Sequence, residues 1–114
     1  MDARVEGKAV TPRIGKPVEV QALWFNALKI MSEFADIFGY ESEKSLYNSM
    51  AEIAAYSFNQ LFWNENEECL YDVLANGHVD ASIRPNQIFA VSLPFSMLKI
   101  DRAKKVVEKV VDQI

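Results

Sequence analysis

The residues best suited to chemistry stand in the stretch RPNQIFAVSLP, residues 84–94, and in Asp80 just before it. Arg84 offers a planar fork of donors, whereas Asn86 and Gln87 each offer both a donor and an acceptor. Asp80 can pair with Arg84 and hold its side chain in place. Polar amides directly before the apolar run IFAVSL indicate the floor of a pocket that binds by hydrogen bonds. The alternative is a loop-to-helix junction that these polar residues cap.

The overall composition limits the kinds of partner. The chain has 114 residues, of which 50% are hydrophobic, and this is enough for one domain with a core. Its formal net charge is -4, and no basic cluster exceeds two adjacent residues, which argues against nucleic acid or an anionic membrane surface. No apolar run approaches the roughly 18 residues of a membrane helix, and the N-terminus has no signal-peptide core. We therefore expect a soluble, cytoplasmic single domain.

Metal and disulfide chemistry are not expected. Cys69 is the only cysteine and His78 the only histidine in the sequence. An internal disulfide framework is therefore excluded, and a zinc site built from His and Cys is not expected. His78, beside Gly77, is most simply a turn residue. We expect no cofactor.

Two long helices are predicted in the first half of the chain. After a loop over residues 1–17, apolar residues at steps of three and four predict a helix over 18–38, with Gly39 as its natural stop. The same spacing predicts a second helix over 43–63, with Ser42 as its N-cap. Because only a few residues join them, 18–63 should form an antiparallel helical hairpin.

The second half begins with a polar excursion over residues 64–85. It contains a short β-like run from Cys69 to Leu74 and then the pair Asn76-Gly77, which is typical of a hairpin turn. We expect two short strands or an irregular loop there.

A second helical hairpin is predicted over residues 86–114. Its arms are a helix over 86–98, which Pro94 ends or kinks, and a helix over 101–114 with Asp101 as its cap. The fold class that follows is all-α: two αα-hairpins with a short β-hairpin-like loop between them.

The predicted helices are apolar over most of their girth. Trp24 lies in the main stripe of the first helix and is expected to pack in the core, whereas Phe25, Ile30 and Tyr56 lie outside the main stripes. Helices of this kind normally sit between other layers. Four helices cannot cover all these faces, so the chain either self-associates, burying Phe25, Ile30 or Tyr56, or is part of something larger.

Four blocks of the sequence resemble the amylo-α-1,6-glucosidase domain of glycogen debranching enzymes. They are MDA at 1–3, TPRIGKPVEVQALWFNAL at 11–28, CLYDV at 69–73 and DASIRPNQIFAVSLP at 80–94. The resemblance implies that residues 1–114 are an internal fragment of an (α/α)6 toroid, and that the partner is glycogen or a branched α-glucan. Two alternatives are a non-catalytic helical module that binds glucan or protein, and a piece of another six-hairpin glycosidase, such as a glucoamylase or trehalase relative.

The resemblance also implies a catalytic role for Asp2. The aspartate of the MDA block looks like the family's general acid, and the general base lies in a later region with no counterpart here. Inverting glycoside hydrolysis needs both carboxyl groups, roughly 6.5–9.5 Å apart with a water between them. We therefore expect α-1,6-glucosidase activity in the complete protein and none in the isolated chain. The simpler interpretation of Asp2 is a solvated terminal residue.

The candidate substrate-binding residues are Glu19, Asp80, Arg84, Asn86 and Gln87. Vicinal sugar hydroxyls require the mixture of donors and acceptors that the last four supply. Glu19, in the KPVEV block, is implied to hydrogen-bond sugar hydroxyls or to orient a group that does. Otherwise its charge simply stabilises a helix N-terminus. Tyr71 and Asp72 either line the active-site cup or are ordinary strand residues, and no metal site is expected.

Overall fold

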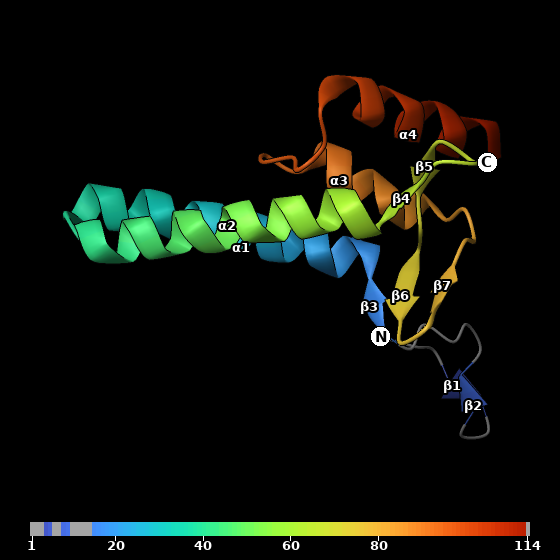
Figure 1. Ribbon diagram of the computed structural model, residues 1–114, viewed down its shortest axis with the longest axis horizontal. Coiled ribbons are helices and arrows are strands. Elements are labelled where there is room, and N and C mark those ends of the chain that lie inside the picture. The colour runs from blue at the N-terminus through green and yellow to red at the C-terminus, as the bar shows by residue number, and fades with distance from the viewer. Residues whose placement is uncertain (1–3, 6–7, 10–14, 114) are drawn as a thin grey trace.

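The computed structural model describes residues 4–5, 8–9 and 15–113. Two long helices, α1 (Val18–Phe38) and α2 (Glu41–Leu61), lie side by side and antiparallel (Figure 1). The bounds predicted for α1 are confirmed. Its C-terminus has Gly39 at φ 78, and the amides of Gly39 and Tyr40 donate to the carbonyls of Asp36 and Ala35. This is a Schellman arrangement, and it requires the left-handed conformation that glycine adopts without strain.

Helix α2 begins and ends two residues earlier than predicted. Ser42 is not its N-cap but lies inside its first turn, because Tyr40 occupies the cap position and its carbonyl accepts from Lys44 N at 2.9 Å. Lys44 also reaches back to Asp36 on α1, with its Nζ 2.9 Å from the carboxylate. The tight connection leaves no room for a longer loop between the helices.

Small antiparallel sheets lie at the other end of the hairpin. The largest has the order β3-β6-β7, formed by β3 (Lys16–Pro17), β6 (Val73–Ala75) and β7 (His78–Asp80). Ala75 pairs with His78 across the predicted Asn76-Gly77 turn, and Gly77 has φ 79. The expected hairpin turn is thus confirmed.

Two further strand pairs correct the sequence interpretation. Strands β1 (Arg4–Val5) and β2 (Lys8–Ala9) pair with each other, so these residues of the segment 1–17, like those of β3, are strand rather than loop. The β-like run from Cys69 to Leu74 is split into β5 (Cys69–Leu70), which pairs with β4 (Trp63–Asn64), and the start of β6.

The helix predicted over 86–98 is much shorter. A 3-10 turn, η1 (Pro85–Ile88), leads into the single helical turn α3 (Phe89–Ser92). Leu93 is already extended, with φ -70 and ψ 157. The pyrrolidine ring of Pro94 disfavours the helical conformation for the residue before it, so the helix ends at Ser92. The second helical hairpin therefore has one very short arm.

The last helix, α4 (Ile100–Gln113), follows a non-helical segment that we call the strap, residues 93–99. Asp101 lies inside the first turn of α4 and is not its cap. Figure 1 shows the strap leaving α3 and turning back to α4 beside the long hairpin.

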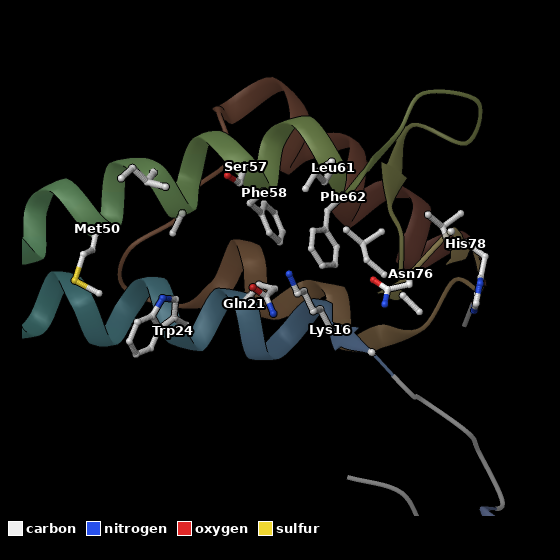
Figure 2. Close-up of a pocket in the computed structure, with 17 residues that line it drawn as sticks. Lys16, Gln21, Trp24, Met50, Ser57, Phe58, Leu61, Phe62, Asn76 and His78 are labelled. Atoms are coloured by element: carbon white, nitrogen blue, oxygen red, sulfur yellow. The ribbon is translucent and has the colours of Figure 1, made fainter.

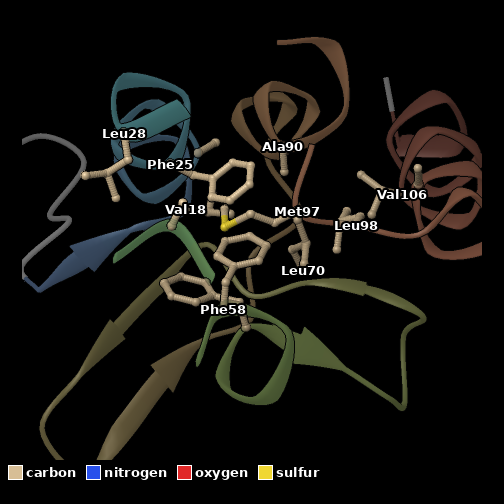
Figure 3. Packing of buried hydrophobic residues seen from close by; sticks show 13 residues of the cluster. Val18, Phe25, Leu28, Phe58, Leu70, Ala90, Met97, Leu98 and Val106 are labelled. Carbon is tan, nitrogen blue, oxygen red and sulfur yellow. The ribbon is translucent and has the colours of Figure 1, made fainter. Parts of the chain in front are cut away.

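The hydrophobic core lies where the first half of α1, the end of α2, β5, α3, the strap and α4 meet. Figure 3 shows this packing. Phe58 and Phe62 stack with ring centroids 4.8 Å apart. The other large buried members are Val18, Phe25, Leu28, Leu70, Met97, Leu98 and Val106. The described chain is mostly helical, with this one core.

A second apolar surface of the hairpin is exposed. Trp24 is 50% exposed, so its predicted place in the core is wrong for this chain. Phe25, expected at an exposed face, is 9% exposed and packs in the core instead, whereas Ile30 and Tyr56 are exposed as expected. Other exposed apolar side chains of α1 and α2 are Val20, Leu23, Met31, Phe34, Leu46, Met50, Ile53 and Leu61. Among the described residues, no helix combines the length and apolar character needed to cross a membrane.

Gly15 permits the close approach of β3 to β6. Its φ is 127, and a Cβ at this position would press into the Leu74 carbonyl oxygen. We expect Gly15→Ala to lower the free energy of unfolding by about 2–4 kcal/mol, from steric overlap and an unfavourable backbone conformation. Gly77→Ala is the matched control, because Gly77 also has positive φ but nothing lies within 4 Å. Urea unfolding of both variants measures the difference, and equal losses would contradict the steric account.

Candidate substrate-binding site

Residues from three separate segments meet beside the first turn of α1. Glu19 lies in that turn, Asp72 directly precedes β6, and Asp80 ends β7. Two backbone hydrogen bonds hold the segments together: Val18 N donates to Asp72 O at 2.8 Å, and Asp72 N donates to Asp80 O at 2.8 Å. The start of α1 is thereby fixed against the β6–β7 hairpin.

Arg84 bridges two carboxylates. Its Nη1 donates to Asp72 Oδ2 and also lies 3.2 Å from Asp80 Oδ2. The predicted pairing of Asp80 with Arg84 is confirmed. Asp72, which is 1% exposed, is a second partner of Arg84. From the sequence its role had stayed open between lining the cup and being an ordinary strand residue. An Asp inside the otherwise apolar run CLYDV was the available signal, because a carboxylate is rarely buried without a partner.

Hydrogen bonds and ion pairs stabilise the charged forms of Asp80 and Arg84. The Ser82 side chain and its backbone amide, which lies 2.9 Å from Oδ1, lower the pKa of Asp80, and Arg84 adds to this effect. Burial acts to lower the pKa of Arg84, but the carboxylates of Asp80 and Asp72 outweigh it and raise that pKa. The Asp80–Arg84 pair is therefore charged at neutral pH, and Arg84 joins β7 to the segment before β6.

Glu19 and Asn86 form a further contact of the cluster, which consists of Glu19, Asp72, Asp80, Arg84 and Asn86. Asn86 Nδ2 donates to Glu19 Oε2 at 3.2 Å across 67 residues of sequence, and both side chains are half-buried. Glu19 also lies in the first turn of α1, where the positive end of the helix dipole stabilises its charge. Both interpretations of Glu19 are therefore compatible with its position.

Gln87 points inward. It is 1% exposed, and its Oε1 accepts from Leu70 N at 3.0 Å, which ties η1 to β5. Its Nε2 is buried without a hydrogen-bond partner among the described residues. A role for Gln87 in substrate binding stays a prediction. Its observed contact anchors η1, the turn that also carries Asn86.

The proposed acid, Asp2, lies outside the described residues. Within the described ranges, no cluster of three His, Cys, Asp or Glu side chains could hold a metal ion. The buried thiol of Cys69 has a raised pKa, because burial disfavours its thiolate, and it is unsuited to act as a nucleophile.

A groove of about 1290 Å³ is separate from this cluster. Figure 2 shows α1 and α2 along its length and the β6–β7 hairpin at one end. None of the predicted site residues that the structure describes lines it. Its polar members are Lys16, Gln21, Ser57, Asn76 and His78, and the remainder is mainly apolar, including Trp24, Ile53 and Leu61. The apolar stripes of α1 and α2 were visible in the sequence. The groove could not be predicted, because it also depends on where the β6–β7 hairpin packs against these helices.

Comparison with known proteins identifies the kind of domain. The matching family is one of glycosidase-type domains, so the chain is of the glycoside hydrolase class. Its model, described as amylo-alpha-1,6-glucosidase, matches residues 1–114, and the chain belongs to this family. The suspected relation to the glucosidase domain of glycogen debranching enzymes is thereby confirmed. A search of curated proteins gave no match.

Proposed function

We propose that this chain forms part of the sugar-binding site of a domain that hydrolyses α-1,6-linked glucose at the branch points of glycogen. The observation that supports this most is the hydrogen bond between Asn86 and Glu19. It joins the two most specific sequence blocks, TPRIGKPVEV and RPNQIFA, at one place in the fold. Those blocks carry the family resemblance, so their convergence favours a shared role.

The chemistry of the cluster suits a neutral, hydroxyl-rich ligand. Glu19, Asp72 and Asp80 carry three negative charges against the single positive charge of Arg84, which leaves a formal charge of -2. Such a site repels anions, and its carboxylate and amide oxygens accept hydrogen bonds from hydroxyl groups. In this proposal Glu19 and Asn86 contact the sugar. Asp80, Arg84 and Gln87 stabilise the surrounding segments through the contacts described above.

The proposed mechanism is inverting and uses two carboxyl groups. Asp2 is the general acid that protonates the leaving glycosidic oxygen, and the general base comes from a part of the domain outside these residues. The two groups would stand roughly 6.5–9.5 Å apart to admit the attacking water. No cofactor takes part in this chemistry.

We further propose that the exposed apolar faces of α1 and α2 are covered by other helices of an (α/α)6 toroid. The support is the set of half-exposed side chains, among them Trp24, Phe34 and Ile53, on helices that also carry a buried face. In the isolated chain the same faces favour self-association. A cytoplasmic location is the one expected for an enzyme that degrades glycogen.

Asn86→Ala tests the proposed site. In a complete glucosidase domain we expect it to lower kcat/KM for a branched limit dextrin by roughly fivefold to tenfold, because one hydrogen bond of about 1 kcal/mol is lost. Asn76→Ala is the control, since Asn76 lies in the β6–β7 turn and outside the cluster. Glucose release gives the measurement. An Asn86→Ala domain with unchanged kcat/KM would remove this cluster from the substrate site.

A further inference from the structure

Asn26 makes an unusual set of hydrogen bonds for a residue in the middle of a helix. It is 5% exposed. Its Nδ2 donates to Ala22 O at 2.9 Å and to Phe95 O at 2.8 Å. Its Oδ1 accepts from Phe95 N at 2.9 Å. One side chain thus satisfies both backbone groups of Phe95, as a neighbouring β-strand would.

Asn59 repeats the pattern on the other long helix. Its Nδ2 donates to Ala55 O at 2.8 Å and to Met97 O at 2.9 Å. Arg102 of α4 approaches the same residue, with Nη1 3.3 Å from Asn59 Oδ1. The strap is therefore held to α1 by Asn26 and to α2 by Asn59, at positions two residues apart.

Asn26 belongs to a closed path of contacts that includes the Glu19–Asn86 pair and returns to α1. From Asn26 the path runs through Phe95 to Ser96, whose Oγ donates to Ala90 O in α3 at 2.7 Å. Helix α3 continues η1, which carries Asn86, and Asn86 returns to α1 at Glu19. The two attachments on α1 are seven residues apart, about 10 Å along the helix axis.

We infer that Asn26 is a positioning residue for the Glu19–Asn86 pair. Two attachments about two turns apart fix how far η1 and α3 can slide along α1, whereas one alone would permit sliding. Asn59 stabilises the strap but holds it to α2, which carries no residue of the cluster. The inference rests on the proposed function in one respect only: the importance of the Glu19–Asn86 pair for sugar binding.

Hydrogen exchange read by mass spectrometry separates the two asparagines, with no glucan present. We expect Asn26→Ala and Asn59→Ala each to speed exchange in the strap by about tenfold, because each loses the side chain that holds it. Only Asn26→Ala should also speed exchange at residues 84–88, by about threefold or more. Since no sugar is used, the result does not depend on whether the chain binds glucan.

Three outcomes decide the matter. Faster exchange at 84–88 in Asn26→Ala alone supports the inference. The same change in both variants, or in neither, overturns it, because Asn26 would then have no effect beyond general stability. If Asn26→Ala does not fold, Ser96→Ala weakens the same path at its next contact. It should also speed exchange at 84–88, and unchanged exchange there would overturn the inference.

Discussion

In a complete glucosidase domain that contains this segment, we expect Asp2→Asn to lower the rate of glucose release by about 10²–10⁴-fold, the usual contribution of a positioned general acid. An amide cannot give up the proton that the leaving glycosidic oxygen needs. The substitution keeps size and shape, so substrate binding should change little. The loss should therefore appear in kcat and leave KM nearly unchanged.

The control for this experiment is Asp101→Asn. Asp101 is exposed in the first turn of α4 and takes no part in the candidate site. Its substitution should leave glucose release from a branched limit dextrin unchanged. The 114-residue chain alone should release no glucose, because the proposed base lies elsewhere. A fully active Asp2→Asn domain would exclude Asp2 as the acid, and turnover by the short chain would exclude the two-carboxylate proposal in this form.

The second large effect is on stability. Arg84→Ala removes the guanidinium that faces the buried carboxylate of Asp72, whose side chain is 1% exposed. Breaking a buried pair by deleting one partner typically costs 3–5 kcal/mol, and the 30% exposure of Arg84 places the expected loss near the lower end, at about 3 kcal/mol. This is a large share of the roughly 5–15 kcal/mol that holds a domain folded.

Two further variants establish the cause. Arg84→Ala combined with Asp72→Asn should lose less than Arg84→Ala alone, because the charge left behind is removed as well. Lys44→Ala breaks an exposed pair with Asp36 and should change the free energy of unfolding far less than Arg84→Ala does, because solvent screens the pair. Urea denaturation at neutral pH measures all of them. A double variant less stable than Arg84→Ala would show that the charge of Asp72 is not the source of the loss.

The sequence predicted correctly those helix ends and turns that depend only on the residues at that point of the chain. Helix α1 ends where Gly39 permits a left-handed turn, and the β6–β7 hairpin turns at Asn76-Gly77. The prediction of a helix over 86–98 was wrong for an equally local reason. Pro94 acts on Leu93 before it, so the periodic run beyond Ser92 could not continue as a helix.

The site was predictable only in part. Asp80 and Arg84 are four residues apart, and their pairing follows from the sequence. Asp72 and Glu19 join them through contacts that depend on tertiary structure, which no local pattern specifies. Trp24 shows a different limit of the sequence. An apolar stripe predicts that a helix face will be covered, but it does not identify what covers it. Within the described residues it is left half-exposed.

The polar contacts that organise the site join distant parts of the chain. Asn86 meets Glu19 across 67 residues, and Phe95 meets Asn26 across 69. The α1–α2 hairpin, by contrast, closes through a turn of two residues between Phe38 and Glu41. Contacts at large sequence separation carry a greater entropic cost of loop closure and form late in folding. During synthesis the α1–α2 hairpin can therefore form first, with Asn26 already in place on α1. The cluster around Glu19 and Asn86 is completed only when residues 84–95 have left the ribosome.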